Sequence, residues 1–420
     1  MEIEFDSEVA RRRRAVELVA DGVSKAEAGR RLGRSRQWVD KWGKRYSADG
    51  DAGLEDRSRA PHQTPTKTPD RVVAKVLAVR DDLEANPVAS IGGLTILAEM
   101  ERDRFTPIPS VATIERILQR HDRTRPRRKK QRSGVPLPLP QVTTPGVWQQ
   151  TDWVQDQWLT GGIRFNSIQL GDVGSQGIAS AQYPDRTLVS AVTFLLERAW
   201  PALSVPQAIS VDNSFSATTH RNNPFTSWVR ACLYFGTEVI VCPPGGLGWN
   251  NHAEAVNNTW QARTIAVSHF TSIEELRAGS DVAVDWLNTR RPILDPDECG
   301  TRYAADYIAA HADTLRWPPP LRIADYLDPK GRLRLPLPNG RITFIRHVTE
   351  QHTVRVANVH WPTPHTIPVG ALVIATLTTK NRKLEIRRNG TTVTTYDYPI
   401  ATPTIDPYYP PADTSLLNHV

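Results

Sequence analysis

Apolar positions follow a helical period in the first third of the chain and a strand period in the last quarter. Residues 7–46 contain three short apolar runs at helical spacing, interrupted at Gly22 and Gly33. Residues 69–121 contain three further amphipathic runs, at 70–85, 91–100 and 111–120. The chain is therefore predicted to begin with two small helical modules.

Serine residues mark two helix starts in the first module. The run Ser24-Lys25-Ala26-Glu27 is a capping box, and Ser35 precedes Arg36-Gln37-Trp38. Two capped helices around a glycine turn predict a helix-turn-helix. Arg36 and Gln37 open the last helix, where an exposed Arg or Gln can form paired hydrogen bonds with base edges. Trp38 and Trp42 are spaced for core packing.

The middle of the chain alternates short strand-like and helix-like segments. Residues 146–290 predict the order β-β-β-α-β-α-β-α, which is an α/β domain. The expected strands are 148–154, 165–170, 178–183, 208–211 and 238–242. The expected helices are 187–199, 224–234 and about 250–268. Functional residues are expected where the strands of such a sheet end.

Period-two alternation dominates residues 340–400. About five short strands are expected there, and Asn389-Gly390 predicts a hairpin turn. Five short strands predict a small β-barrel. Its strands carry many basic residues, which favours sequence-neutral contact with DNA or with a neighbouring subunit, although Lys and Arg also protect exposed strand edges.

Composition narrows the function classes. The chain has 420 residues, a net charge of +7 and a pI near 9.4, which favours a polyanionic partner. Basic clusters occur at 11–14 and 123–132. No apolar run reaches the length of a membrane span, and the first residues do not resemble a signal peptide. Three scattered cysteines suggest reduced thiols. A cytoplasmic, nucleoid-associated protein is expected.

Three acidic residues organise the predicted α/β domain. Asp152 lies in the first strand, Asp212 ends the fourth, and Glu254 opens the helix after a Gly/Pro segment. Acids converging at one sheet edge repel each other unless cations neutralise them, and oxygen ligands select Mg²⁺ or Mn²⁺. Taken singly, each of the three is also typical of a turn, a helix start or a solvated surface.

The order of the motifs resembles the DDE transposases and retroviral-type integrases. The resemblance rests on Trp-Gln-x-x-Asp at 148–152, Asp-Asn-Ser-Phe at 212–215, and Pro-Pro-Gly followed by Trp-Asn-Asn-x-x-Glu at 243–254. It implies a ribonuclease H-like core in which Asp152, Asp212 and Glu254 are both catalytic and metal-binding, with two Mg²⁺ or Mn²⁺ ions per site. It also implies DNA ends and target DNA as partners and at least a dimer; an accessory ATPase stays open.

The expected protein is multidomain: all-α helix-turn-helix modules, an α/β ribonuclease H-like core and a small C-terminal β-barrel. The expected boundaries are 1–50, 51–68 (basic linker), 69–121, 122–145 (basic, Pro-rich linker), 146–290, 291–339 (connector), 340–400 and 401–420 (tail). The expected DNA contacts are Arg36, Gln37, Arg57, Arg59, Arg127, Arg128, Lys129, Lys130, Asn258 and Gln261.

Two departures from the family pattern keep other functions open. Ser214 stands where the family usually has Gly, and His252-Ala253 replace the commoner pair before Glu254. If the turn at Ser214 requires a positive φ, the site is strained. A catalytically decayed or domesticated transposase acting as a sequence-specific DNA-binding protein is therefore one alternative. A metal-dependent nuclease that cuts without joining is another. His252 could touch the reacting strand, but a structural role is more common for a lone histidine.

Overall fold

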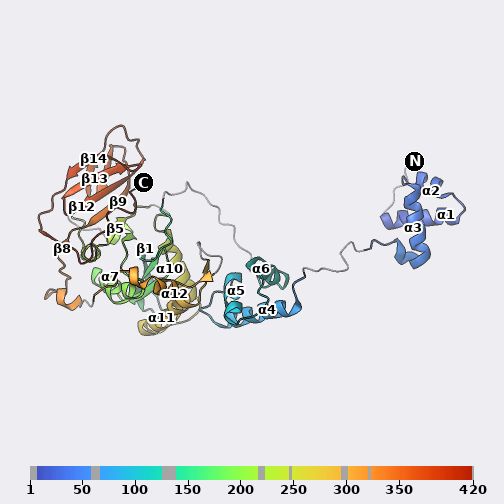
Figure 1. The fold of residues 1–420 in the computed structure, drawn as a ribbon, viewed down its shortest axis with the longest axis horizontal. Helices are drawn as coiled ribbons and strands as arrows, with labels where there is room; N and C mark the ends of the chain where they lie inside the picture. The colour runs from blue at the N-terminus through green and yellow to red at the C-terminus, as the bar shows by residue number, and fades with distance from the viewer. Residues whose placement is uncertain are drawn as a thin grey trace. The chain divides into compact units, whose positions relative to one another are not determined.

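The computed structural model describes residues 7–57, 67–124, 139–215, 223–245, 248–294, 301–319 and 323–418. The chain divides into two compact units, Met1–Thr68 and Pro69–Val420 (Figure 1). Arg59 and the predicted DNA contacts at 127–130 lie outside the described residues. None of the helices that the structure describes is both long and apolar enough to cross a membrane.

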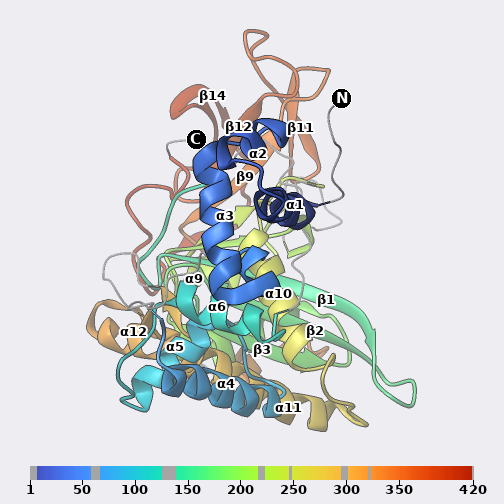
Figure 2. The same ribbon diagram turned by 90° about the vertical axis from the view of Figure 1, so that its right-hand side faces the viewer.

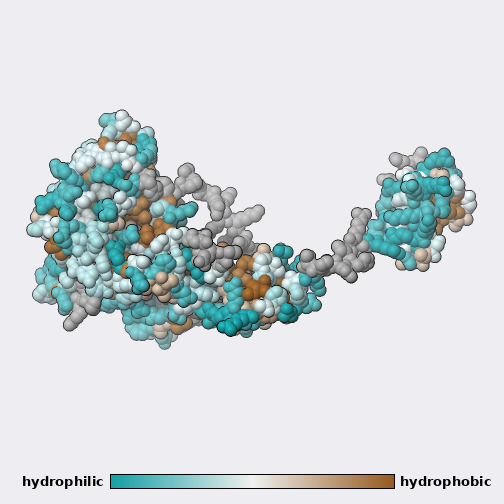
Figure 3. Space-filling model, in the orientation of Figure 1, coloured by the Kyte–Doolittle hydropathy of each residue, from teal (hydrophilic) through white to brown (hydrophobic). Residues whose placement is uncertain are grey.

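The first unit is the predicted helix-turn-helix. It contains α1 (Glu8–Ala20), α2 (Lys25–Arg31), α3 (Arg36–Asp49) and the 3₁₀ helix η1 (Gly50–Leu54). The Ser24 and Ser35 side chains accept hydrogen bonds from Glu27 N and Trp38 N, as their spacing predicts. Gly33 follows α2 with φ +64°. A small apolar core closes the three helices, formed by Ala15, Leu18, Ala28, Leu32 and Val39. Around that core, the face visible in Figure 3 is mostly hydrophilic.

The arginine run in α1 is not a uniform DNA-facing cluster. Arg12 is only 6% exposed, and its guanidinium donates to Leu54 O at 2.7 Å and to Asp56 Oδ1 at 2.8 Å. It also lies over the Trp42 ring, 3.9 Å from the centroid. Because Arg12 is three residues before Ala15, it shares the buried face of the helix. Arg13 forms an exposed ion pair with Asp51.

The second helical module packs on the α/β core. It comprises α4 (Asp70–Ala85), α5 (Gly93–Arg102) and α6 (Val111–Arg120), close to the predicted ranges. Its apolar core is shared with Val256 of α10 (Asn251–Arg263) and Trp286 of α11 (Ile273–Thr289), beside which it lies in Figure 2. Arg263 donates to Ala89 O, and Arg290 pairs with Glu99. The module is therefore part of the second unit rather than a separately tethered domain.

A nine-stranded sheet forms the centre of the second unit, in the order β14-β13-β12-β9-β5-β4-β1-β2-β3. β2 pairs antiparallel with both β1 and β3. β4 pairs in parallel with both β1 and β5. Their bounds are β1 Trp148–Trp158, β2 Arg164–Asp172, β3 Ile178–Tyr183, β4 Ala208–Val211 and β5 Glu238–Val241. The order β3-β2-β1-β4-β5 with this pattern is ribonuclease H-like, as the predicted element order implied.

Helices cover both faces of these five strands. On one face pack α7 (Leu188–Phe194), the π-turn η2 (Leu195–Ala199), α8 (Trp200–Leu203) and α9 (Ser227–Tyr234). The other face holds α10 and α11, where Trp260 Nε1 donates to Ser280 Oγ at 2.8 Å. The helix carrying Glu254 ends at Arg263, five residues earlier than expected, and Thr264 begins a turn. Asp172 ends β2 as a turn acid, since Ser175 N and Oγ both donate to it.

The C-terminal strands extend the central sheet. β9 (Arg341–His347) pairs in parallel with β5, and β12 (Leu372–Thr378), β13 (Lys383–Arg388) and β14 (Thr391–Asp397) continue from it. A separate hairpin, β10 (Thr353–Val356) and β11 (Val359–Pro362), packs on these strands through Trp361, which stacks on Tyr398. The strands are present as predicted, but a barrel is not confirmed.

Short elements connect the core to these strands. They are β6 (Ile293–Leu294), β7 (Thr301–Arg302), α12 (Ala304–Ala310), η4 (Ala312–Thr314), η5 (Ile323–Tyr326), β8 (Leu337–Pro338) and, in the tail, β15 (Thr404–Ile405). The tail is not wholly irregular, because β15 pairs with β8 and Leu417 packs in a small core with Trp148. These contacts hold the C-terminal segment against the sheet.

Candidate active site

The strand register brings two of the three predicted acids to the same level. In the parallel pair of β1 and β4, Gln150 lies opposite Ser210. Two residues further along each strand come Asp152 and Asp212, so the pairing carries both carboxylates to one edge of the sheet. Glu254 lies in the first turn of α10, exposed, on the helix that packs over β1 and β2.

Electrostatic interactions link the three carboxylates. Burial raises the pKa of Asp152 to about 6, and the charges of Asp212 and Glu254 act in the same direction. Burial also raises the pKa of Cys242 to about 12, and the same three carboxylates add to that rise. Mutual repulsion between like charges is relieved when a cation binds to them.

Neighbouring polar groups orient two of the carboxylates. Asp152 Oδ1 accepts from Trp153 N at 2.8 Å, and Asp152 Oδ2 accepts from Asn257 Nδ2 at 3.2 Å. Asp212 Oδ1 accepts from Ser214 N at 2.9 Å and from Ser214 Oγ at 2.5 Å. Ser214 does not adopt a positive φ. Serine therefore causes no backbone strain here, and it supplies a hydroxyl donor that glycine would lack.

Two residues that sequence reasoning did not single out join α10 to β1. Gln150 is 1% exposed, and its Oε1 accepts from His252 N at 3.0 Å and from Ala253 N at 3.4 Å. Asn250 Nδ2 donates to Thr151 O at 3.1 Å. Gln150 thus caps the first turn of α10 from the strand that carries Asp152. Asn250 belongs to the recognised Trp-Asn-Asn-x-x-Glu motif, whereas Gln150 occupies an unspecified position of Trp-Gln-x-x-Asp, so the sequence pattern gives no signal for it.

His252 has a structural position. Its side chain packs against β2 at Gly171, where an added Cβ would lie 2.5 Å from His252 Nε2. Burial lowers the pKa of His252 to about 4, and the Arg291 charge lowers it further. The imidazole is therefore neutral near pH 7. This location favours the structural role that the sequence had suggested for a lone histidine.

A divalent cation is implied by the family that the motifs resemble, and the donor set fits one. Three carboxylates supply hard oxygen ligands, and Asn257 Oδ1 and Asn250 Oδ1 are buried without a hydrogen-bond partner. Within the described ranges, however, no three His, Cys, Asp or Glu side chains are arranged closely enough to enclose a metal ion. Binding of ions therefore requires the carboxylates to draw closer together.

The predicted DNA contacts that the structure describes are mostly accessible. Arg36 and Gln37 are exposed at the start of α3, and Asn258 is exposed on α10. Gln261 is partly exposed on the same helix. Arg57 is exposed and pairs with Asp49 at 2.5 Å, so its guanidinium is not committed to the protein interior.

Comparisons with known protein families identify the helical modules. Residues 6–55 match one model of a homeodomain-like domain, and residues 38–118 match a second. The chain therefore carries homeodomain-like helix-turn-helix domains, which bind DNA.

Solved structures similar to the chain include retroviral integrases. One is a simian T-cell lymphotropic virus intasome in complex with the PP2A regulatory subunit B56 gamma; identity is 13%, TM-score 0.35, and coverage 64% of this chain and 84% of that one. Another is the HTLV-2 integrase catalytic core domain in complex with magnesium, in its dimeric form, with 14% identity, TM-score 0.27, and coverage of 39% and 97%. For the trimeric form of the same domain, identity is 14%, the TM-score is 0.28, and coverage is 38% of this chain and 95% of that one.

Proposed function

We propose that the protein is a DDE transposase or integrase. It would bind the terminal inverted repeats of a mobile DNA element, cleave the 3′ ends and join them to target DNA. The observation that supports this proposal is the strand register that brings Asp152 and Asp212 to the same level of a ribonuclease H-like sheet, where burial and then the charges of Asp212 and Glu254 raise the pKa of Asp152. The homeodomain-like domains supply the DNA-binding function that such an enzyme needs.

In this proposal the three carboxylates would hold two Mg²⁺ or Mn²⁺ ions. The bound ions would activate the attacking oxygen and stabilise the leaving oxygen in phosphoryl transfer. The chain itself orients the ligands: Asn257 and Ser214 hold the carboxyl groups of Asp152 and Asp212, and Gln150 fixes the start of α10. No side-chain nucleophile is required, because water or a DNA 3′-OH attacks.

DNA contacts would be divided between the two units. Arg36 and Gln37 would read bases from α3, since a recognition helix contacts base edges with its first turn. Asn258 and Gln261 would hydrogen-bond the DNA end near the carboxylates. We expect Arg36→Ala to weaken repeat binding by about 1–3 kcal/mol and to relax preference at one base pair. A footprint with unchanged preference would contradict this assignment.

The alternative of a decayed transposase rested on two departures from the family pattern, Ser214 and His252. The structure accommodates both residues. Ser214 forms the turn without a positive φ and bonds Asp212, and His252 is accommodated opposite Gly171. A decayed protein would still bind the repeats but would leave DNA intact. A nuclease would cut the ends without producing joined products. Both outcomes are visible in one gel assay.

The test uses DNA from both sides of the gene as substrate, where the proposal predicts terminal inverted repeats. Asp152→Asn, Asp212→Asn and Glu254→Gln should each abolish cleavage and joining in Mg²⁺ or Mn²⁺ and leave repeat binding within about twofold of wild type, a range we set from the usual scatter of surface substitutions. Asp156→Asn is the matched control, because Asp156 is an exposed acid on the same strand and its ion pair, among the described residues, is with Arg164. Joining by any of the three variants at the control rate would refute the proposal.

A further inference from the structure

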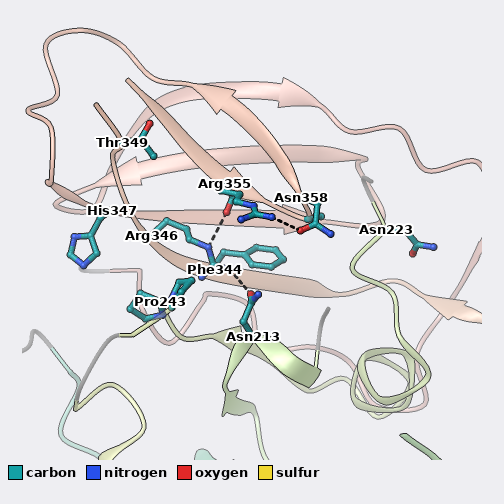
Figure 4. A pocket seen from close by; sticks show the side chains of 11 residues that line it. Asn213, Asn223, Pro243, Phe344, Arg346, His347, Thr349, Arg355 and Asn358 are labelled. Carbon is teal, nitrogen blue, oxygen red and sulfur yellow. Dashed lines mark hydrogen bonds between the residues drawn. The ribbon is translucent and has the colours of Figure 1, made fainter. Parts of the chain in front are cut away.

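A cavity of about 300 Å³ lies between the end of the catalytic sheet and the C-terminal hairpin (Figure 4). Asn213, which directly follows Asp212, lines one side, together with Pro243 at the start of the segment that leads to Glu254. Arg346 of β9 and Arg355 of β10 line the other side. The cavity therefore lies one residue from Asp212 and receives its positive charge from the C-terminal strands.

Arg346 is a buried cation whose hydrogen-bond acceptors among the described residues are all neutral. It is 6% exposed. Its guanidinium donates to the carbonyl oxygens of Val241, Cys242 and Ile345 and to Asn213 Oδ1, the last at 2.9 Å. Nε donates to the Arg355 carbonyl at 2.9 Å. These bonds fix the guanidinium but do not neutralise it.

Arg355 adds a second positive charge at the same cavity. Its side chain is exposed, and its guanidinium donates to Asn358 Oδ1 at 3.1 Å. Burial lowers the pKa of Arg346 to about 10, and the Arg355 charge lowers it further. In the part of the chain that the structure describes, no carboxylate forms an ion pair with either arginine. A buried charge without a counter-charge is unfavourable, so this cavity is complementary to an anion.

The lining favours a phosphodiester over an unstacked base. The aromatic side chains of the lining are Phe344 and His347: Phe344 is only 1% exposed and offers no open face for base stacking, and the exposed His347 ring is held through Nδ1 by Gly370 O at 3.0 Å. Guanidinium groups, in contrast, match the geometry of phosphate oxygens. The cavity also lies one residue from Asp212, where the backbone of a reacting strand would pass.

We propose that this cavity, through Arg355 at its mouth and Arg346 at its wall, holds one phosphodiester of the joined DNA next to the scissile position. The inference rests on the proposed strand-transfer function. The phosphodiester belongs either to the mobile-element end or to the target strand. The chemistry is the same in both cases, and strand-specific substitution separates them.

The experiment measures binding of the full-length protein to a synthetic branched DNA that copies the joined product, because the branch fixes the register of both strands. The Asp152→Asn background prevents reaction. Single methylphosphonate linkages, which lack the phosphate charge, are placed in turn along the element strand and the target strand. Binding of each DNA is measured for three proteins. They are the Asp152→Asn parent and two variants of this parent that also carry Arg355→Ala or Arg355→Lys.

At one linkage, we expect loss of the phosphate charge to weaken DNA binding by the parent roughly tenfold, as for a lost charge-assisted hydrogen bond. The same change should hardly affect DNA binding by the Arg355→Ala protein. Arg355→Ala should also reduce the salt slope by about 0.9 on unmodified DNA. Arg355→Lys should retain part of the coupling, because it keeps the charge. The strand that carries the coupled linkage identifies the source of the phosphodiester.

Arg388→Ala is the matched control. It removes the same charge from β13, outside the cavity lining, and should show no coupling to any single linkage. Absence of a coupled linkage for Arg355→Ala on both strands would overturn the inference. Failure of the proposed function would look different: the parent would not prefer the branched DNA to an unbranched duplex of the same sequence.

Discussion

The cap that Gln150 provides for α10 leads to the sharpest prediction. Replacing Gln150 by Ala removes the acceptor of His252 N and Ala253 N without touching a carboxylate. The first bond, at 3.0 Å, is well formed, and a buried N–H left without an acceptor costs about 1–3 kcal/mol. The second, at 3.4 Å, is long and adds little. We therefore expect the unfolding free energy to fall by about 2 kcal/mol.

The same change should lower activity more than it lowers binding. Glu254 lies in the turn that Gln150 caps, so a loosened turn holds its carboxylate near Asp152 for less of the time. If half to all of the lost energy appears at the reacting geometry, end cleavage slows by roughly 5- to 30-fold. Single-turnover cleavage in Mn²⁺ measures this, while repeat binding should stay unchanged.

The control is Gln155→Ala, which removes the same side chain from an exposed position of the same strand. It should match wild type in both melting and cleavage. If Gln150→Ala behaved like Gln155→Ala in both measurements, the capping bonds would have no role in positioning Glu254, and the reasoning would be wrong.

Two further predictions concern the same edge of the sheet. Because burial and its acidic neighbours raise the pKa of Asp152 from 3.8 to about 6, its ionised form is disfavoured in the folded state. Stability should therefore fall as pH rises from about 4 to about 6, by up to about 3 kcal/mol. In metal-free buffer at pH 7, Asp152→Asn should melt above wild type, and Mg²⁺ should raise only the wild-type melting temperature; a less stable Asp152→Asn protein would contradict the linkage. Gly171→Ala places a Cβ 2.5 Å from His252 Nε2 and should displace α10, lowering both stability and cleavage, whereas Gly43→Ala, which meets no atom within 4 Å, should not.

Local chemistry was enough to predict the helix-turn-helix and the strands near Asp152 and Asp212. Serine caps and a glycine stop depend on neighbours three residues away, and the strand that ends just before Asp212 is entirely buried and mostly apolar. The burial of Arg12 was missed because four consecutive arginines suggested one exposed surface. Its spacing to Ala15 placed it on the core side of α1.

Long-range pairing explains what the sequence did not reveal. Gln150 bonds residues more than a hundred positions away, and Arg346 reaches Asn213 across a similar separation. A period-two pattern predicts strands and their faces, but it does not choose their partners. The strand at Arg341–His347 therefore looked like part of a separate barrel, whereas its register joins it to β5.

The parallel pairing of β9 with β5 makes the C-terminal region a covering for the catalytic sheet. Without this pairing, the backbone N–H and C=O groups on one side of Glu238–Val241 would form an open sheet edge. All four residues of this strand are buried in the protein. Open apolar edges recruit strands from other molecules. A protein truncated before β9 would thus be prone to aggregate, and its loss of activity would say little about DNA. For this chain, single substitutions such as Arg355→Ala isolate the role of the C-terminal strands in a way that domain deletion does not.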